Sequence, residues 1–261
     1  MSSARSGGGS LTGSVAIVTG ASRGIGRALA IGLADAGAAV VCAARTEVES
    51  PGSLAGTIHA TAEAVTARGG SALAVRCDIG NERDIEKLFE STRARFGRVD
   101  VLVNNAMTPT RAPFSESTSD QWDESMRVNV RSLFLTSKAA MGPMADVGGG
   151  SIINISSGAA DPKVVGLPPG YLTYSVAKAA LERFSTALAG ELAPLGIAVN
   201  ALRPGAVKTE TAVHELGEGY DWTGWTDPEA VVPAVVFLAA QRGDGLTGRI
   251  VDSTQYGVTW P

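Results

Sequence analysis

The chain has 261 residues, of which 44% are hydrophobic and 18% charged, and this composition excludes an intrinsically disordered protein. Its 22 Lys and Arg against 26 Asp and Glu give a net charge of −4, whereas a nucleic-acid-binding protein normally carries a basic excess. Since no apolar run is long enough to span a bilayer, we expect neither a nucleic-acid nor a membrane partner.

The cysteines and the N-terminus indicate a compartment. Cys42 and Cys77 lie in apolar, strand-like runs, and two thiols make neither a disulfide framework nor a zinc site. We therefore predict buried free thiols, no metal site and a cytoplasmic location. Residues 1–10 are rich in Ser and Gly and lack the apolar segment of a signal peptide, so they are expected to form a flexible tail.

Strand and helix patterns alternate from about residue 14 onward. Short apolar runs typical of buried strands cover 15–19, 39–43, 73–76, 99–103, 151–155, 197–202 and, more weakly, 250–251. Helical periodicity covers 24–36, 54–68, 82–96, 119–145, 172–193 and 228–240. This order predicts an α/β fold, in which helices cover both faces of a parallel sheet.

We expect one domain over residues 11–261, a Rossmann-type, doubly wound sheet of about seven strands. The longest irregular stretch of the second half is 206–227, which carries His214, Trp222 and Trp225. Because a lid over a ligand lies on a long loop beyond the carboxyl end of a strand, we assign 206–227 as the substrate loop.

The first strand leads into a glycine-rich turn, Thr19-Gly-Ala-Ser-Arg-Gly-Ile-Gly26. Glycines permit a tight turn and the close approach of a pyrophosphate, and the following helix points free N–H groups at the phosphates. The turn therefore predicts a dinucleotide site. The contacts expected here are Gly20, Ser22, Arg23, Gly24, Ile25 and Gly26.

The end of the second strand indicates which dinucleotide binds. NAD sites usually place Asp or Glu there to accept from the ribose 2′-hydroxyl, but this strand ends at Arg45. Arg45 can meet a 2′-phosphate, and Arg23 lies close enough in the fold to help, so we favour NADP(H) over NAD(H). The alternative is that Arg45 is a solvated strand-end residue and Arg23 only a helix-start residue.

Tyr174 and Lys178 are four residues apart and therefore share one face of a helix. A cation beside a phenol favours the phenolate, which would make Tyr174 a usable general acid and base near neutral pH. Tyr171 has no lysine four residues on. The alternative is an ordinary surface pair, because Tyr-x-x-x-Lys is common by chance.

The motifs together resemble the short-chain dehydrogenase/reductase family over about residues 11–252. Each motif is weak alone, but the set in this order is specific. The motifs are Thr19 to Gly26, Asp78, Asn104-Asn105-Ala106, Asn129, Ser156-Ser157, Tyr174 with Lys178, and Arg203-Pro204-Gly205.

The resemblance implies a role for each catalytic residue. Tyr174 would exchange a proton with the substrate oxygen, and Lys178 would hold the nicotinamide ribose and tune Tyr174. Ser157, favoured over Ser156, would donate a hydrogen bond to the substrate carbonyl. Asn129 would support a water that links Lys178 to solvent.

The resemblance also implies the remaining cofactor contacts. Asp78 would contact the adenine, Asn104 would brace the central sheet, and Val207 and Thr209 would lie nearest the nicotinamide carboxamide. The further cofactor contacts are Arg45, Asp78, Ile79, Asn105, Ala106, Tyr174, Lys178, Pro204, Gly205, Val207 and Thr209.

Some positions depart from the family or stand outside its motifs. Met107 stands where the family usually has Gly, and it either shapes the substrate pocket or is a tolerated replacement. Trp222 and Trp225 are candidates for substrate contact or for plain packing. The family's habit of forming oligomers implies a homotetramer or dimer, in which Trp260 would pack across a subunit boundary.

We therefore predict an NADP(H)-dependent oxidoreductase that acts on a carbonyl compound or the matching secondary alcohol. One alternative is a catalytically silent dinucleotide-binding sensor or structural subunit. Another is an epimerase or dehydratase on the same scaffold, which would recycle its cofactor.

Overall fold

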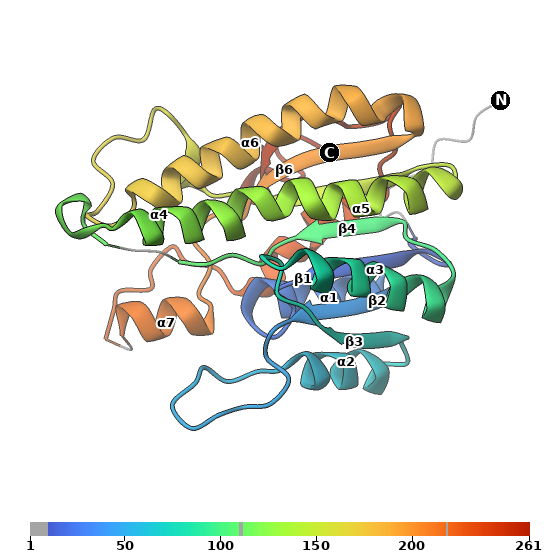
Figure 1. Ribbon diagram of the computed structural model, residues 1–261, viewed down its shortest axis with the longest axis horizontal. Helices are drawn as coiled ribbons and strands as arrows, with labels where there is room; N and C mark the ends of the chain where they lie inside the picture. The colour runs from blue at the N-terminus through green and yellow to red at the C-terminus, as the bar shows by residue number, and fades with distance from the viewer. Residues whose placement is uncertain (1–9, 110–111, 218) are drawn as a thin grey trace.

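The computed structural model describes residues 10–109, 112–217 and 219–261, so nearly all of the predicted tail lies outside the described residues. Within them, seven parallel strands form one sheet in the order β3-β2-β1-β4-β5-β6-β7 (Figure 1). Each predicted strand is confirmed to within two residues at either end. The strands are β1 Val15–Thr19, β2 Ala39–Ala44, β3 Ala72–Arg76, β4 Val101–Asn104, β5 Gly150–Ile155, β6 Ile197–Arg203 and β7 Ile250–Asp252.

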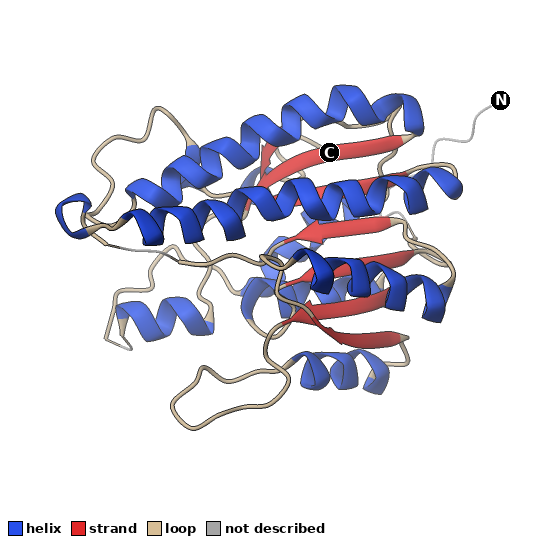
Figure 2. Ribbon diagram, in the orientation of Figure 1, coloured by secondary structure: helices blue, strands red, loops and turns tan. Residues whose placement is uncertain are grey.

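Helices cover both faces of this sheet, as predicted (Figure 2). One face carries α1 Gly24–Asp35, α2 Ile58–Ala67 and α8 Val232–Ala239. The other carries α3 Glu82–Phe96, α5 Ser132–Asp146 and α6 Leu172–Leu192, whereas α4 Ser119–Met126 lies beyond the carboxyl ends of the strands. The helix α7, Glu210–Leu216, stands apart beyond the carboxyl ends of the strands (Figure 1).

The strand side chains divide between two cores. Ala16 and Val18 of β1 pack into the core under α1 and α8, whereas Val15 and Ile17 pack into the core under α3, α5 and α6. Successive side chains of a strand point to opposite faces, so a strand covered on both faces reads as an unbroken apolar run. This burial explains why the strands were predictable.

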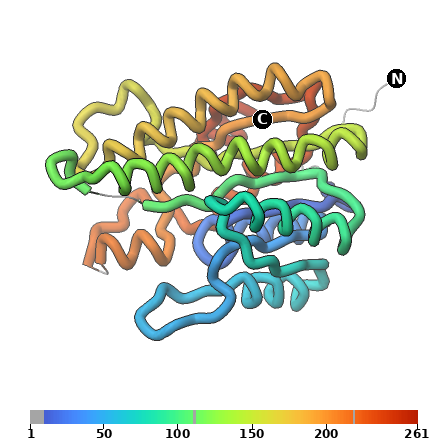
Figure 3. Tube along the Cα trace, in the orientation of Figure 1, coloured from blue at the N-terminus to red at the C-terminus, as the bar shows by residue number. Residues whose placement is uncertain are grey.

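The strand order reverses between β1 and β4, as the path of the trace shows (Figure 3). The chain runs outward from β1 to β3, then returns to place β4 beside β1, with Ile17 opposite Leu102. The loops after β1 and β4 therefore leave the sheet in different directions and open a crevice at its carboxyl edge, where ligands of such folds bind.

Four sequence predictions need correction. The helix predicted at 228–240 opens with a 3₁₀ turn, Pro228–Val231, and α8 begins only at Val232. The helix predicted at 54–68 begins only at Ile58, because the Thr57 side chain caps it by accepting from Ala60 N. The helix predicted at 119–145 is interrupted by a π-helical turn, Arg127–Arg131, between α4 and α5. The segment 206–227 is not irregular throughout, since α7 begins after Thr209, whose hydroxyl accepts from Ala212 N at 3.1 Å.

None of the helices in the described ranges has both the length and the apolar character needed to cross a membrane. No group of three or more metal-binding side chains occurs among the residues that the structure describes. Cys42 and Cys77 are buried free thiols, as predicted, and burial raises the pKa of each to about 12.

Candidate active site

A cleft of about 410 Å³ opens at the carboxyl edge of the sheet. Of the catalytic and cofactor residues predicted from sequence, all but Asn129 line it. Those lining residues are Gly20, Ser22, Arg23, Gly24, Ile25, Gly26, Arg45, Asp78, Ile79, Asn105, Ala106, Ser157, Tyr174, Lys178, Pro204, Gly205, Val207 and Thr209. They come from segments throughout the chain, so the fold brings the motifs together.

The glycine-rich turn after β1 is packed too tightly for side chains. A Cβ atom on Gly26 would lie 2.2 Å from the carbonyl oxygen of Gly20, and Gly20 itself has a φ of +69°. The Asn105 amide holds the turn by donating to Thr19 O at 2.9 Å. No side chain caps the start of α1, which leaves its first N–H groups available to an anion. The turn therefore fits a pyrophosphate.

Arg23 lines the cleft, and its predicted contact with a cofactor phosphate stays a prediction, but the structure adds partners that the sequence did not indicate. Its guanidinium donates three hydrogen bonds to backbone carbonyls of the loop after β2, at 2.8 to 3.0 Å, accepted by Leu54, Ala55 and Gly56. This loop lies close against the turn, since a Cβ on Gly56 would be 2.4 Å from Ser22 O. Arg23 thus fastens the loop to the turn, while Arg45 is exposed at the cleft.

Two further cofactor-side residues are held by the fold. The Asp78 carboxylate accepts from Gly80 N at 2.9 Å at the cleft wall. Asn104 was predicted to brace the central sheet and the cofactor, and the sheet contact is confirmed, because its buried amide donates to Asn154 Oδ1 at 2.8 Å and accepts from Thr136 Oγ1 at 2.9 Å. Asn104 joins β4 to β5 and α5 rather than lining the cleft.

Tyr174 and Lys178 both line the cleft from the first turns of α6. Lys178 Nζ lies 5.8 Å from the centre of the Tyr174 ring and donates to Ile155 O at 2.6 Å. Burial lowers the pKa of Lys178 to about 8, and the nearby Glu182 carboxylate partly opposes this by favouring the charged form. The ammonium is therefore fixed by the end of β5 beside the phenol.

The two serines after β5 point in different directions. Ser156 turns its hydroxyl toward α6 and donates to Glu182 Oε1 at 2.8 Å. Ser157 has an extended backbone and lines the cleft, where its hydroxyl accepts from Ala159 N at 3.2 Å. Both serines line the cleft, but the Ser156 hydroxyl is engaged by Glu182, and side chains alternate along an extended chain. The assignment of Ser157 as the substrate-side serine stays a prediction.

Asn129 lies in the π-helical turn and is buried. Its amide exchanges two hydrogen bonds with the backbone of Thr108, accepting at 2.9 Å and donating at 3.1 Å. Asn129 thereby fixes the segment that follows Met107. Met107 itself lines the cleft. A π turn often marks a functional position, but the water-supporting role of Asn129 stays a prediction.

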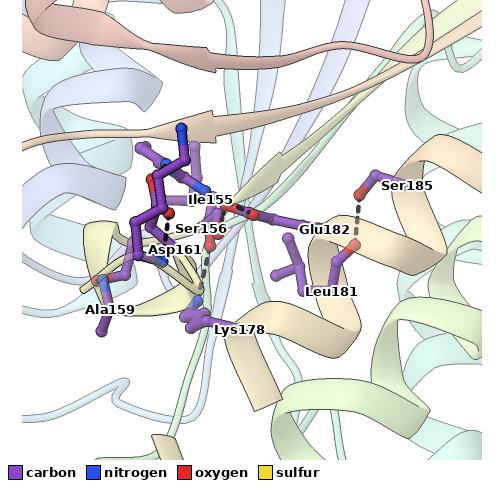
Figure 4. Close-up of polar contacts among 11 residues, drawn as sticks. Ile155, Ser156, Ala159, Asp161, Lys178, Leu181, Glu182 and Ser185 are labelled. Carbon is purple, nitrogen blue, oxygen red and sulfur yellow. Dashed lines mark hydrogen bonds and ion pairs between the residues drawn. The ribbon is translucent and has the colours of Figure 1, made fainter. Parts of the chain in front are cut away.

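A buried ion network that the sequence did not reveal lies behind Lys178 (Figure 4). Glu182 accepts from Arg203 Nε at 2.7 Å and Nη2 at 2.9 Å, and Arg203 Nη1 donates to Asp161 at 2.9 Å. Arg203 was visible as a motif residue without a role. Glu182 was detectable only as a carboxylate one turn beyond Lys178 on the same helix.

The far end of the cleft is lined mainly by apolar and aromatic side chains, among them Met107, Pro109, Tyr171, Leu216 and Trp225. Met107 therefore does line the cleft. Of the tryptophans predicted as candidates for substrate contact, only Trp225 reaches the lining.

Trp222 and Trp260 pack within the chain. Trp222 packs against Tyr220 and lies beneath the Lys208 ammonium, which is 5.1 Å from its ring centre. Trp260 packs against Tyr256 of its own chain and donates to Asp252 O, so the expectation that it reaches across a subunit boundary is not needed to explain its position.

The substrate segment 206–227 is closed at its base. Lys208 N donates to Thr226 O at 2.8 Å and Thr226 N donates to Ala206 O at 2.9 Å, so its two ends are pinned side by side. Thr209, the first residue before α7, also contacts the glycine-rich turn, because a Cβ on Gly24 would lie 3.2 Å from Thr209 Cγ2. The segment is thus anchored against the cofactor end of the cleft.

Comparison with known proteins gives consistent matches. A family model described as short chain dehydrogenase matches residues 14–218. An uncharacterized oxidoreductase of Methylorubrum extorquens is 38% identical, over 94% of this chain and 97% of the relative. A chloroplastic NADPH-dependent aldehyde reductase-like protein of Arabidopsis thaliana is 32% identical, over 92% and 93%. The crystal structure of a hydroxysteroid dehydrogenase from Escherichia coli matches with a TM-score of 0.79 at 28% identity, over 93% and 95%.

Proposed function

The chain belongs to the short-chain dehydrogenase family of oxidoreductases, and from this premise we propose that it transfers a hydride between NADP(H) and a carbonyl compound or secondary alcohol. The observation that carries the proposal is that Ser157, Tyr174 and Lys178 meet in one cleft with the glycine-rich turn. One cleft therefore holds both the turn that would bind the dinucleotide and the side chains that would transfer the proton.

The side chains divide the work of this reaction. The bound nicotinamide supplies or accepts the hydride. Ser157 and Tyr174 donate hydrogen bonds to the substrate oxygen, where negative charge develops during reduction. Tyr174 then gives its proton to that oxygen, and the Lys178 ammonium stabilises the phenolate that remains. In oxidation of an alcohol the same proton moves in reverse.

The preference for NADP(H) is supported by charge at the end of β2. No carboxylate follows the strand directly, and Arg45 is exposed at the cleft, where a 2′-phosphate would accept its hydrogen bonds. A relative is described as NADPH-dependent and aldehyde reductase-like, which supports the same cofactor and a carbonyl substrate. NAD(H) is the weaker alternative.

Initial rates with NADPH and with NADH across chemically varied ketones and aldehydes test the proposal, together with the substitution Tyr174→Phe. We expect turnover with NADPH, and a loss of kcat of at least about 10³-fold in Tyr174→Phe, because the proton donor is removed while packing is kept. Cofactor affinity, measured by fluorescence titration, should change little.

Tyr171→Phe is the matched control, because the Tyr171 ring lies 6.1 Å from that of Tyr174 and also lines the cleft. It should keep kcat within about threefold of wild type. Cofactor binding without turnover of any compound would instead identify a silent sensor or structural subunit. Product formation without net NADPH consumption would identify an epimerase or dehydratase.

We also propose a homo-oligomer acting in the cytoplasm. The adjacent helices α5 and α6 expose Phe134, Met141, Leu172 and Val176, and such side chains are typical of a surface covered by another copy. The two free thiols support a reducing compartment.

A further inference from the structure

Glu182 is a buried carboxylate that the proposed reaction does not use. It is only 6% exposed and accepts three hydrogen bonds, one from Ser156 and two from Arg203. Ser156 directly follows β5, Arg203 ends β6, and Glu182 lies on α6. One side chain therefore joins the three elements that carry the reaction centre (Figure 4).

The bond to Ser156 bears on its neighbour. Because the hydroxyl of Ser156 is drawn toward α6, the extended backbone directs Ser157 to the opposite side, into the cleft. The second partner, Arg203, reaches on to Asp161 in the loop that follows Ser157. The segment from Ser156 to Asp161 is therefore held at two points, directly by Glu182 at Ser156 and through Arg203 at Asp161.

Glu182 also sets the charge around Lys178. Glu182 on the helix itself and Asp161 from the loop after β5 lie near this turn of α6 (Figure 4), and Arg203 from β6 pairs with both. Arg183, next to Glu182 on α6, is an exposed charged residue. Tyr174 is the titratable neighbour on the helix. Removal of the Glu182 charge would leave the buried Lys178 and Arg203 as two cations without the carboxylate between them.

We propose that Glu182 is a positioning residue for the reaction centre, which directs Ser157 into the cleft and holds an anionic charge one helical turn from the Lys178 ammonium. This inference rests on the proposed hydride transfer. Glu182 reaches the substrate only through Ser156, Arg203 and Lys178.

The test compares Glu182→Gln with Glu182→Asp. Glutamine keeps the volume but removes the charge and one acceptor, so we expect kcat to fall about tenfold or more while the Kd for NADPH stays within about twofold. In ¹³C-lysine NMR without cofactor, the Lys178 titration, assigned with Lys178→Met, should shift to lower pH. Aspartate keeps the charge, so its Lys178 titration should stay near wild type and its kcat should lie between the two.

The outcomes are separable from those of the proposed function. A wild-type protein that turns over no carbonyl compound with NADPH overturns both. An active wild type overturns this inference alone if folded Glu182→Gln keeps kcat within twofold, or leaves the Lys178 titration in place.

A second variant keeps the test open should Glu182→Gln not fold. Asp161→Asn removes the outer end of the network, and Val165→Ala, in the same loop and 88% exposed, is its control. We expect Asp161→Asn to raise the substrate KM threefold or more with kcat and the Kd for NADPH little changed. Equal KM values for the two variants would overturn the proposal.

Discussion

The two ends of the cleft are built by different means. At the cofactor end, the backbone of Gly26 lies against that of Gly20, and the Arg23 side chain donates to backbone carbonyls of a neighbouring loop. At the catalytic end, charged side chains lie behind the cleft wall: the buried Lys178 donates to Ile155 O, and one helical turn on Glu182 pairs with the half-buried Arg203. The first end is sensitive to added atoms, whereas the second is sensitive to a lost or unpaired charge.

The largest expected effect comes from adding one methyl group at the cofactor end. Gly26→Ala would place a Cβ 2.2 Å from Gly20 O, a backbone atom that can move only if the turn opens. We expect a loss of about 3 kcal/mol in the free energy of unfolding and of about 100-fold in NADPH affinity. Chemical denaturation and fluorescence titration measure the two effects.

Gly190→Ala is the control for this change. Gly190 is exposed on α6, and a Cβ there would meet nothing within 4 Å among the described atoms. The substitution should stabilise the protein by about 0.5–1 kcal/mol, because alanine favours a helix. If Gly26→Ala were as mild, the backbone contact would not govern this end of the cleft.

The catalytic end should respond to pH instead. Burial lowers the pKa of Lys178 from 10.5 to about 8, so between these values the unfolded chain holds a proton that the folded protein has released. Stability then rises with pH across this window, and below pH 8 the full cost of the buried charge is present. Relative to Lys178→Met, wild type should gain about 2 kcal/mol over the window.

Denaturation at a series of pH values measures this difference, and Lys138→Met is the control because Lys138 is an exposed lysine on α5. The difference in free energy of unfolding between wild type and Lys138→Met should not change with pH over the same window. A flat difference for Lys178→Met as well would mean that the ammonium is not buried in solution, and the contrast between the two ends would fail.

The smallest effect separates the two arginines of the cofactor end. Arg23→Ala removes three hydrogen bonds to the loop after β2, so it should cost about 1 kcal/mol of stability and weaken NADPH and NADH equally. Arg45→Ala should raise the KM for NADPH about tenfold and leave that for NADH unchanged.

Arg27→Ala is the control, because the Arg27 side chain makes no hydrogen bond to any described residue and does not line the cleft. It should match wild type in stability and in both KM values. A loss confined to NADPH in Arg23→Ala would restore Arg23 as a phosphate ligand and contradict the loop-fastening role.

The sequence predicted well what depends on local pattern. Strands buried on both faces read as apolar runs, and the glycine-rich turn has a fixed spacing, so the fold and the lining of the cleft were accessible. The helix α7 was missed because seven residues carry too little periodicity and its start depends on the Thr209 cap. The partners of Arg23 and Glu182 lie 21 to 33 residues away, beyond any local signal.

Paired hydrogen bonds between Ala206, Lys208 and Thr226 hold the two ends of the segment 206–227 together, and Thr209, close to its entry, contacts the glycine-rich turn. The entry and exit of the segment are adjacent. Lengthening or replacing its interior therefore changes the free energy of loop closure by only a few tenths of a kcal/mol, and each doubling of its length costs about 0.6 kcal/mol. The sheet and the ion network lie outside the segment and need not adjust. The same scaffold can therefore accept a transplanted segment, and with it a reshaped cavity for a different substrate.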